Sequence, residues 1–122
     1  MRNMQRTEFE KLVVDALDDL PEEFQQKLEN IEVVVEDEPS ADILRQMNIT
    51  PPNILLGLYQ GVPLNKRGRG YANVLPDKIS LYQWPIESVC RDEDELKERV
   101  REVVMHEIGH YFGLSEEEIR EA

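Results

Sequence analysis

The sequence is poor in several residue types that mark common protein classes. Its 122 residues include one cysteine, two histidines, and only 14 Lys and Arg against 26 Asp and Glu. A single cysteine, Cys90, has no partner for an internal disulfide, which favours a reducing compartment. The net charge of −12 argues against binding to nucleic acid or to an anionic membrane surface, because both are bound through clusters of Lys and Arg.

Long apolar runs are also missing. No stretch approaches the roughly 20 apolar residues needed to cross a bilayer, and residues 1–8 lack the apolar segment of a signal peptide. Together with the single cysteine, these absences predict a cytoplasmic protein. Apolar residues still make up 40% of the chain, which is enough for a core, so we expect one globular domain over residues 1–122.

The first third of the chain predicts two helices. Thr7 and Glu10 form a capping-box pattern, and the apolar residues that follow keep the three-to-four spacing of one buried helix face. Pro21 suits the first turn of a second, short helix, for which Asn30 is a plausible end.

The rest of the chain predicts strands followed by one long helix. Residues 37–53 hold three prolines and indicate a loop, with one helical turn around Leu44. Asp92 with Glu95 offers an N-cap for a helix that runs to Gly113. Strands are expected at residues 31–36, 54–60, 71–75 and 78–84. This order predicts an α+β fold, with a small mixed β-sheet packed against the long helix and the N-terminal helices.

Both histidines fall within one five-residue segment of the long helix, His106-Glu107-Ile108-Gly109-His110. Positions four apart lie one turn apart on the same helix face, so the two imidazoles can converge on one ion. Neutral imidazole is a preferred ligand of Zn²⁺, and three protein ligands plus water make a catalytic zinc site. Glu107 beside the first histidine can then act as the general base that accepts a proton from that water.

The helix pattern supports a special role for Glu107. Its position falls within the apolar arc of the helix, where a carboxylate is desolvated unless it is paired, hydrogen-bonded or beside a metal. The alternative for Glu107 is a residue at the margin of the core whose carboxylate reaches water. The alternative for the histidines is a surface pair on a charged helix. The apolar arc is formed by Leu96, Val100, Val103, Val104, Ile108 and Tyr111.

A third ligand has to come from outside this segment. Gly113 allows a sharp turn after the helix, and four glutamates follow it, of which Glu116 is favoured over Glu117, Glu118 and Glu121. Ser115 also suits the N-cap of a short final helix, where glutamates in the first turn are favourable without any metal. Both interpretations can hold together, because a first-turn glutamate can also point at a metal.

The chain resembles the small single-domain zincin-like family of bacterial metallopeptidases. The resemblance is carried by residues 20–24, 33–39, 55–64 and 74–79, and most specifically by residues 104–115, which contain the histidine segment. It implies a zincin-like fold, zinc ligands at His106 and His110, and Glu107 as general base. In the pattern H-E-x-x-H-x-x-G-x-x-E, Glu116 stands where the family usually carries Asp as third ligand, and its side chain is one methylene longer.

The sequence therefore predicts a zinc metallopeptidase that hydrolyses peptide bonds through metal-activated water, acting on a peptide or protein substrate. Zincin sites usually bind extended substrates at a sheet edge, and residues 70–75 are the candidate edge in this sequence. The alternatives are an inactive or weakly metal-binding zincin-like module with a binding or regulatory role, and a protein in which the ion only stabilises the final turn. Cys90 is expected to be a buried, small apolar residue rather than a nucleophile.

Overall fold

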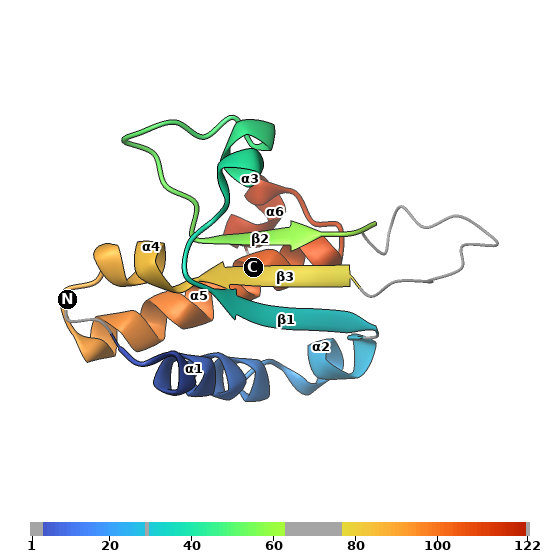
Figure 1. Ribbon diagram of the computed structural model, residues 1–122. Coiled ribbons are helices and arrows are strands. Elements are labelled where there is room, and N and C mark those ends of the chain that lie inside the picture. The colour runs from blue at the N-terminus through green and yellow to red at the C-terminus, as the bar shows by residue number, and fades with distance from the viewer. Residues whose placement is uncertain (1–3, 29, 63–76, 122) are drawn as a thin grey trace.

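The computed structural model describes residues 4–28, 30–62 and 77–121, which form helices around a small sheet (Figure 1). The helices are α1 (Arg6–Asp18), α2 (Glu22–Lys27), α3 (Ala41–Gln46), α4 (Gln83–Ser88), α5 (Glu93–Tyr111) and α6 (Glu116–Glu121). The strands are β1 (Ile31–Glu36), β2 (Gly57–Gln60) and β3 (Asp77–Tyr82). The predicted α+β class is confirmed.

The sheet is mixed, as predicted, with strand order β1-β3-β2. The central strand β3 pairs in parallel with β1, with Val33 opposite Ile79, and antiparallel with β2, with Tyr59 opposite Ile79. Strand β2 is therefore an edge strand of the described sheet.

Helix α5 packs against one face of this sheet, and α1 packs against α5 (Figure 1). Ile79 and Leu81 of β3 are 1% and 0% exposed and share one core with apolar residues of both helices. Helix α1 contributes Phe9 and Val13 to this core, because residues four apart lie on the same helix face. The buried stripe of α5 contains the residues that the sequence predicted: Leu96, Val100, Val103, Val104, Ile108 and Tyr111.

The predicted start of the first helix is wrong. Helix α1 begins at Arg6, and its N-cap Gln5 makes no side-chain capping bond, so Thr7 lies inside the helix. The start is fixed instead by tertiary contacts of the preceding segment. The backbone N–H of Met4 donates to Glu87 at 2.6 Å, and its carbonyl accepts from Gln83 at 2.7 Å.

The last strand is also shorter than predicted. Strand β3 ends at Tyr82, and residues 83 and 84 instead open α4, a helix that the sequence did not predict. Pro85 is the third residue of α4, where a missing N–H is tolerated because the first-turn donors have no partner within the helix.

Other predicted boundaries hold with small changes. Strand β1 has its predicted bounds, α3 is the helical turn expected around Leu44, and β2 begins at Gly57 rather than at residue 54. Asn30 adopts a left-handed φ of 49° after α2. The expected strand at residues 71–75 lies outside the described residues. Among the helices that the structure describes, none is both long and apolar enough to cross a membrane.

Candidate metal centre

The long helix α5 carries both histidines and has well-defined ends. Asp92 is its N-cap and accepts the backbone N–H of Glu95 at 2.8 Å, as the sequence predicted. At the other end, Gly113 adopts a φ of 85° and donates to the His110 carbonyl, while Leu114 donates to the Gly109 carbonyl. This pair of bonds is a Schellman turn, in which glycine supplies the left-handed residue. The turn changes the direction of the chain at Gly113, three residues after His110.

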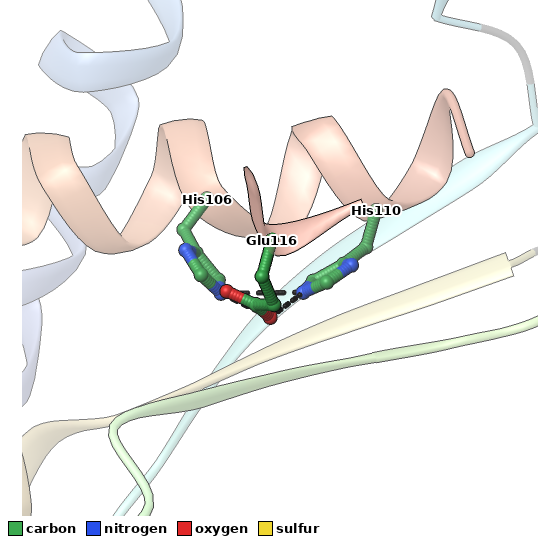
Figure 2. A group of neighbouring side chains, drawn as sticks. All are labelled: His106, His110 and Glu116. Carbon is green, nitrogen blue, oxygen red and sulfur yellow. Dashed lines mark hydrogen bonds and ion pairs between the residues drawn. The ribbon is translucent and has the colours of Figure 1, made fainter. Parts of the chain in front are cut away.

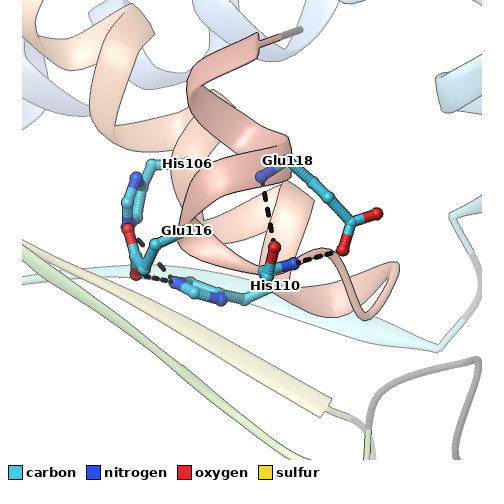
Figure 3. A network of polar contacts seen from close by, with 5 residues as sticks. His106, His110, Glu116 and Glu118 are labelled. Atoms are coloured by element: carbon cyan, nitrogen blue, oxygen red, sulfur yellow. Dashed lines mark hydrogen bonds and ion pairs between the residues drawn. The ribbon is translucent and has the colours of Figure 1, made fainter.

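After this turn the chain forms α6, whose first residue is Glu116. Ser115 and Glu118 cap this helix reciprocally: the backbone N–H of Glu118 donates to Ser115 Oγ, and that of Ser115 donates to Glu118 Oε1, both at 3.1 Å. The predicted cap at Ser115 is confirmed. Because Glu118 serves in the cap, its carboxylate points away from the two imidazoles (Figure 3).

His106, His110 and Glu116 converge on one point (Figure 2). The Nε2 atoms of the two histidines are 3.2 Å apart, and Glu116 Oε1 lies 3.2 Å from His106 Nε2 and 2.9 Å from His110 Nε2. Each of these three atoms can present a lone pair, the Nε2 atoms in the tautomer protonated at Nδ1, and in that state a shared cation stabilises the arrangement.

The donor set fits a zinc ion. With metal–ligand bonds of about 2.0–2.2 Å, two ligands of a tetrahedral zinc are about 3.3–3.6 Å apart. The three observed separations, 2.9–3.2 Å, are slightly shorter, so small side-chain rotations would seat the ion. Two imidazole nitrogens and one carboxylate oxygen are also the catalytic donor set that leaves a fourth position for water. The structure thus brings together His106, His110 and Glu116, and among the glutamates whose side chains are described, Glu116, Glu117 and Glu118, it is Glu116 that lies there.

Glu107 is buried beside this group, as its place in the apolar arc predicted. It is 6% exposed, and burial raises its pKa from 4.5 to about 7. The negative charge of Glu116 raises the pKa further, whereas His110 and a hydrogen bond from the backbone N–H of Tyr59 lower it. A carboxyl group with a pKa near neutrality can both accept and release a proton at physiological pH.

A cleft of about 410 Å³ contains all four of these side chains. Gly57 and Tyr59 of β2 line it from the sheet, and Leu114 lines it from the turn after α5. At Gly57 a Cβ atom would lie 2.8 Å from Val103 Cγ1 and 3.2 Å from the Ser80 carbonyl oxygen, so only glycine lets β2 approach α5 this closely.

Comparison with known proteins agrees with this geometry. A family model described as zincin-like metallopeptidase matches residues 28–122. The chain belongs to this family. The resemblance inferred from the sequence is therefore confirmed, and the family to which the chain belongs is one described as zincin-like metallopeptidases.

A solved structure supports the zincin-like fold. A conserved hypothetical protein from Thermo thermophilus is 22% identical, and the match covers 89% of this chain and 94% of that chain with a TM-score of 0.63. At this level of identity the likeness shows the fold alone. No curated protein matches the chain.

The zincin-like chain has one feature of the site that the sequence did not predict, the edge of β2. The Leu56 carbonyl accepts the N–H of Tyr82, so Leu56 and Tyr82 are a hydrogen-bonded pair. Along an antiparallel ladder, hydrogen-bonded and non-hydrogen-bonded pairs alternate. The backbone groups of Gly57 and Tyr59 therefore point away from β3. The hydrogen bond from Tyr59 to Glu107 agrees with this direction. Residues 70–75, the predicted edge, lie outside the described residues. The sequence signal that could have indicated this edge is Gly57 within the expected strand at residues 54–60, because glycine in a strand often marks a close approach of another backbone.

Cys90 lies in the core of this zincin-like fold, 3% exposed, which agrees with its predicted role as a packing residue. Burial raises the pKa of its thiol and thereby disfavours the thiolate.

Proposed function

We propose that the protein is a zinc-dependent peptidase in which His106, His110 and Glu116 hold the metal and Glu107 moves the proton. The observation that carries this proposal is the convergence of three ligand atoms within 2.9–3.2 Å of one another in the cleft that Glu107 also lines. When bound, zinc would supply Lewis acidity that polarises a carbonyl group and lowers the pKa of water.

Glu107 has the properties of the base in this reaction. Its carboxylate accepts a proton from the attacking water and then donates that proton to the amine nitrogen of the leaving peptide. In the metal-free protein burial raises the pKa of this carboxyl group to about 7, closer to neutral pH than that of an ordinary glutamate. The hydrogen bond from the Tyr59 backbone N–H fixes the position of the carboxylate through both steps.

The peptide substrate would bind along β2. The Tyr59 N–H is bound to Glu107, so the backbone groups of Gly57 are the ones that an extended peptide would meet at the edge of β2, where it would add by main-chain hydrogen bonds. The absence of a side chain at Gly57 keeps this edge accessible beside Glu107, which is 3.4 Å from the place a Cβ would take.

The test compares the wild-type protein with Glu107→Gln and His106→Ala. The zinc content of each purified protein is measured by inductively coupled plasma mass spectrometry. Peptide hydrolysis is measured by detecting cleavage products of a broad peptide library by mass spectrometry. We expect zinc with cleavage in the wild type, zinc without cleavage in Glu107→Gln, and loss of both in His106→Ala. The exposed Glu98→Gln on the same helix is the control and should behave like the wild type.

Two outcomes would count against the proposal. A zinc-loaded wild type that cleaves no peptide would indicate a metal with a purely stabilising role, and chelation should then lower only the melting temperature. Cleavage by Glu107→Gln at the wild-type rate would exclude Glu107 as the proton carrier.

A further inference from the structure

The third ligand of the proposed centre lies on a very short helix. Helix α6 has six residues, Glu116–Glu121. Isolated helices shorter than about 12–15 residues are marginal in water, so α6 needs packing against the rest of the protein to hold a fixed position. The cap between Ser115 and Glu118 closes its first turn but does not attach it to α5.

Besides the polar contacts of Glu116, a contact between Ile119 of α6 and Gly109 of α5 attaches the helix. A Cβ atom at Gly109 would lie 2.7 Å from Ile119 Cγ1 and 2.9 Å from Ile119 Cδ1, distances that real Cβ contacts do not show. The half-buried Ile119 side chain therefore fills the space that the missing side chain of Gly109 leaves. A Cβ atom at position 109 would displace the Ile119 side chain from this space.

The spacing along the two helices links this contact to the metal ligands. Residues three apart lie on the same face of a helix, so Ile119 and Glu116 share one face of α6, and Gly109 and His106 share one face of α5. Seating Ile119 against Gly109 thus turns Glu116 toward His106, where its Oε1 lies 3.2 Å from the imidazole Nε2.

We propose that Ile119, seated against Gly109, is a positioning residue that sets the zinc affinity of the centre by holding Glu116 beside the two imidazoles. This inference rests on the proposed zinc site and not on peptide hydrolysis. Residues that orient metal ligands typically account for about 10- to 100-fold in metal affinity. The side chain of Glu116 is 59% exposed, so little packing holds it directly, and its position depends on how α6 is docked.

The experiment is a double-mutant cycle read out as the zinc dissociation constant. Wild type, Gly109→Ala, Ile119→Ala and the double variant are titrated with zinc in competition with a chromophoric chelator, after circular dichroism has confirmed that each is folded. We expect each single substitution to weaken zinc binding about 10- to 100-fold. In the double variant the Cβ atoms of the two alanines would lie about 3.9 Å apart, which is an ordinary van der Waals contact. The overlap that Gly109→Ala alone creates with the Ile119 side chain is therefore absent. Its affinity should be no weaker than that of Ile119→Ala alone.

Two further variants make the result specific. Ile119→Val keeps part of the side chain in the space beside Gly109 and should restore most of the affinity lost in Ile119→Ala. Glu117→Ala removes an exposed side chain from the same helix and should bind zinc like the wild type. If Gly109→Ala does not fold, the zinc affinities of Ile119→Ala and Ile119→Val are compared instead. Equal affinities would then overturn the inference.

The possible failures are distinguishable. Wild-type affinity in both Gly109→Ala and Ile119→Ala, with weakened binding in Glu116→Ala, would overturn this inference and leave the proposed function standing. Multiplicative losses in the double variant would also overturn it, since they would mean that the two residues act independently. A wild-type protein that does not bind zinc would refute the proposed function, and this inference with it.

Discussion

Replacing Glu107 by glutamine should stabilise the metal-free protein at alkaline pH. The wild-type carboxyl group has a pKa raised by burial to about 7, against 4.5 for an ordinary glutamate. Above pH 7 the folded protein therefore has to keep a charged group in a site where it is only 6% exposed. Glutamine has nearly the same shape and can still accept the N–H of Tyr59, but it carries no charge.

The size and sign of the effect follow from proton linkage. A difference of about 2.5 pH units in pKa corresponds to about 3 kcal/mol. Between pH 4.5 and 7 the folded state binds more protons than the unfolded state, so the wild-type free energy of unfolding falls as pH rises through this window. Below the window the carboxyl group is protonated in both states, and the penalty is absent.

The assay is urea unfolding of both proteins in excess chelator, at several pH values from about 4 to about 8. The two proteins share all other titrating groups, so the contributions of those groups largely cancel when one free energy of unfolding is subtracted from the other. We expect the stability of Glu107→Gln relative to the wild type to rise by about 3 kcal/mol from the acid to the alkaline end. Glu98→Gln, which removes a carboxylate that is 72% exposed on the same helix, is the control and should change the free energy of unfolding by less than about 0.5 kcal/mol. A pH-independent difference for Glu107→Gln would refute the argument from burial.

Four further outcomes are expected from the same structure. Glu116→Ala should weaken zinc binding in a chelator competition, whereas Glu117→Ala should leave it unchanged; equal effects would contradict the ligand role of Glu116. Gly113→Ala should lower the free energy of unfolding by about 1–2 kcal/mol, because φ is 85° at this position. Asp92→Ala should cost about 1 kcal/mol in urea unfolding through loss of the N-cap bond. Gly57→Ala should cost about 1–3 kcal/mol and raise KM, since its Cβ would overlap Val103.

The stability cost of Glu107 follows from its position in the fold. A carboxylate in the buried stripe of α5 is unfavourable for folding, and the same burial gives it a pKa suited to proton transfer. The rest of the stripe offsets this cost with fully apolar residues such as Leu96 and Val100, both 0% exposed. We therefore expect the metal-free protein to be less stable than its glutamine variant above about pH 7.

Much of the fold could be predicted because the signals are local. The spacing of apolar residues predicted α5 and its buried face, and Gly113 predicted its end. The start of α1 could not be predicted from Thr7, because contacts with Gln83 and Glu87, far along the chain, fix the preceding backbone. Helix α4 was missed because Pro85 is equally compatible with the end of a strand and with a first helical turn.

The sequence by itself determined that His106 and His110 share one helix face and that Glu107 lies among apolar neighbours, since helix geometry is fixed by hydrogen bonds between residues four apart. Only the tertiary structure decided which glutamate joins the histidines and which strand borders the cleft. Both depend on packing between segments: Ile119 against Gly109 turns Glu116 inward, and Gly57 lets β2 approach α5. Such contacts depend on the shapes of surfaces that meet only in the folded chain, and spacing along the sequence does not contain them.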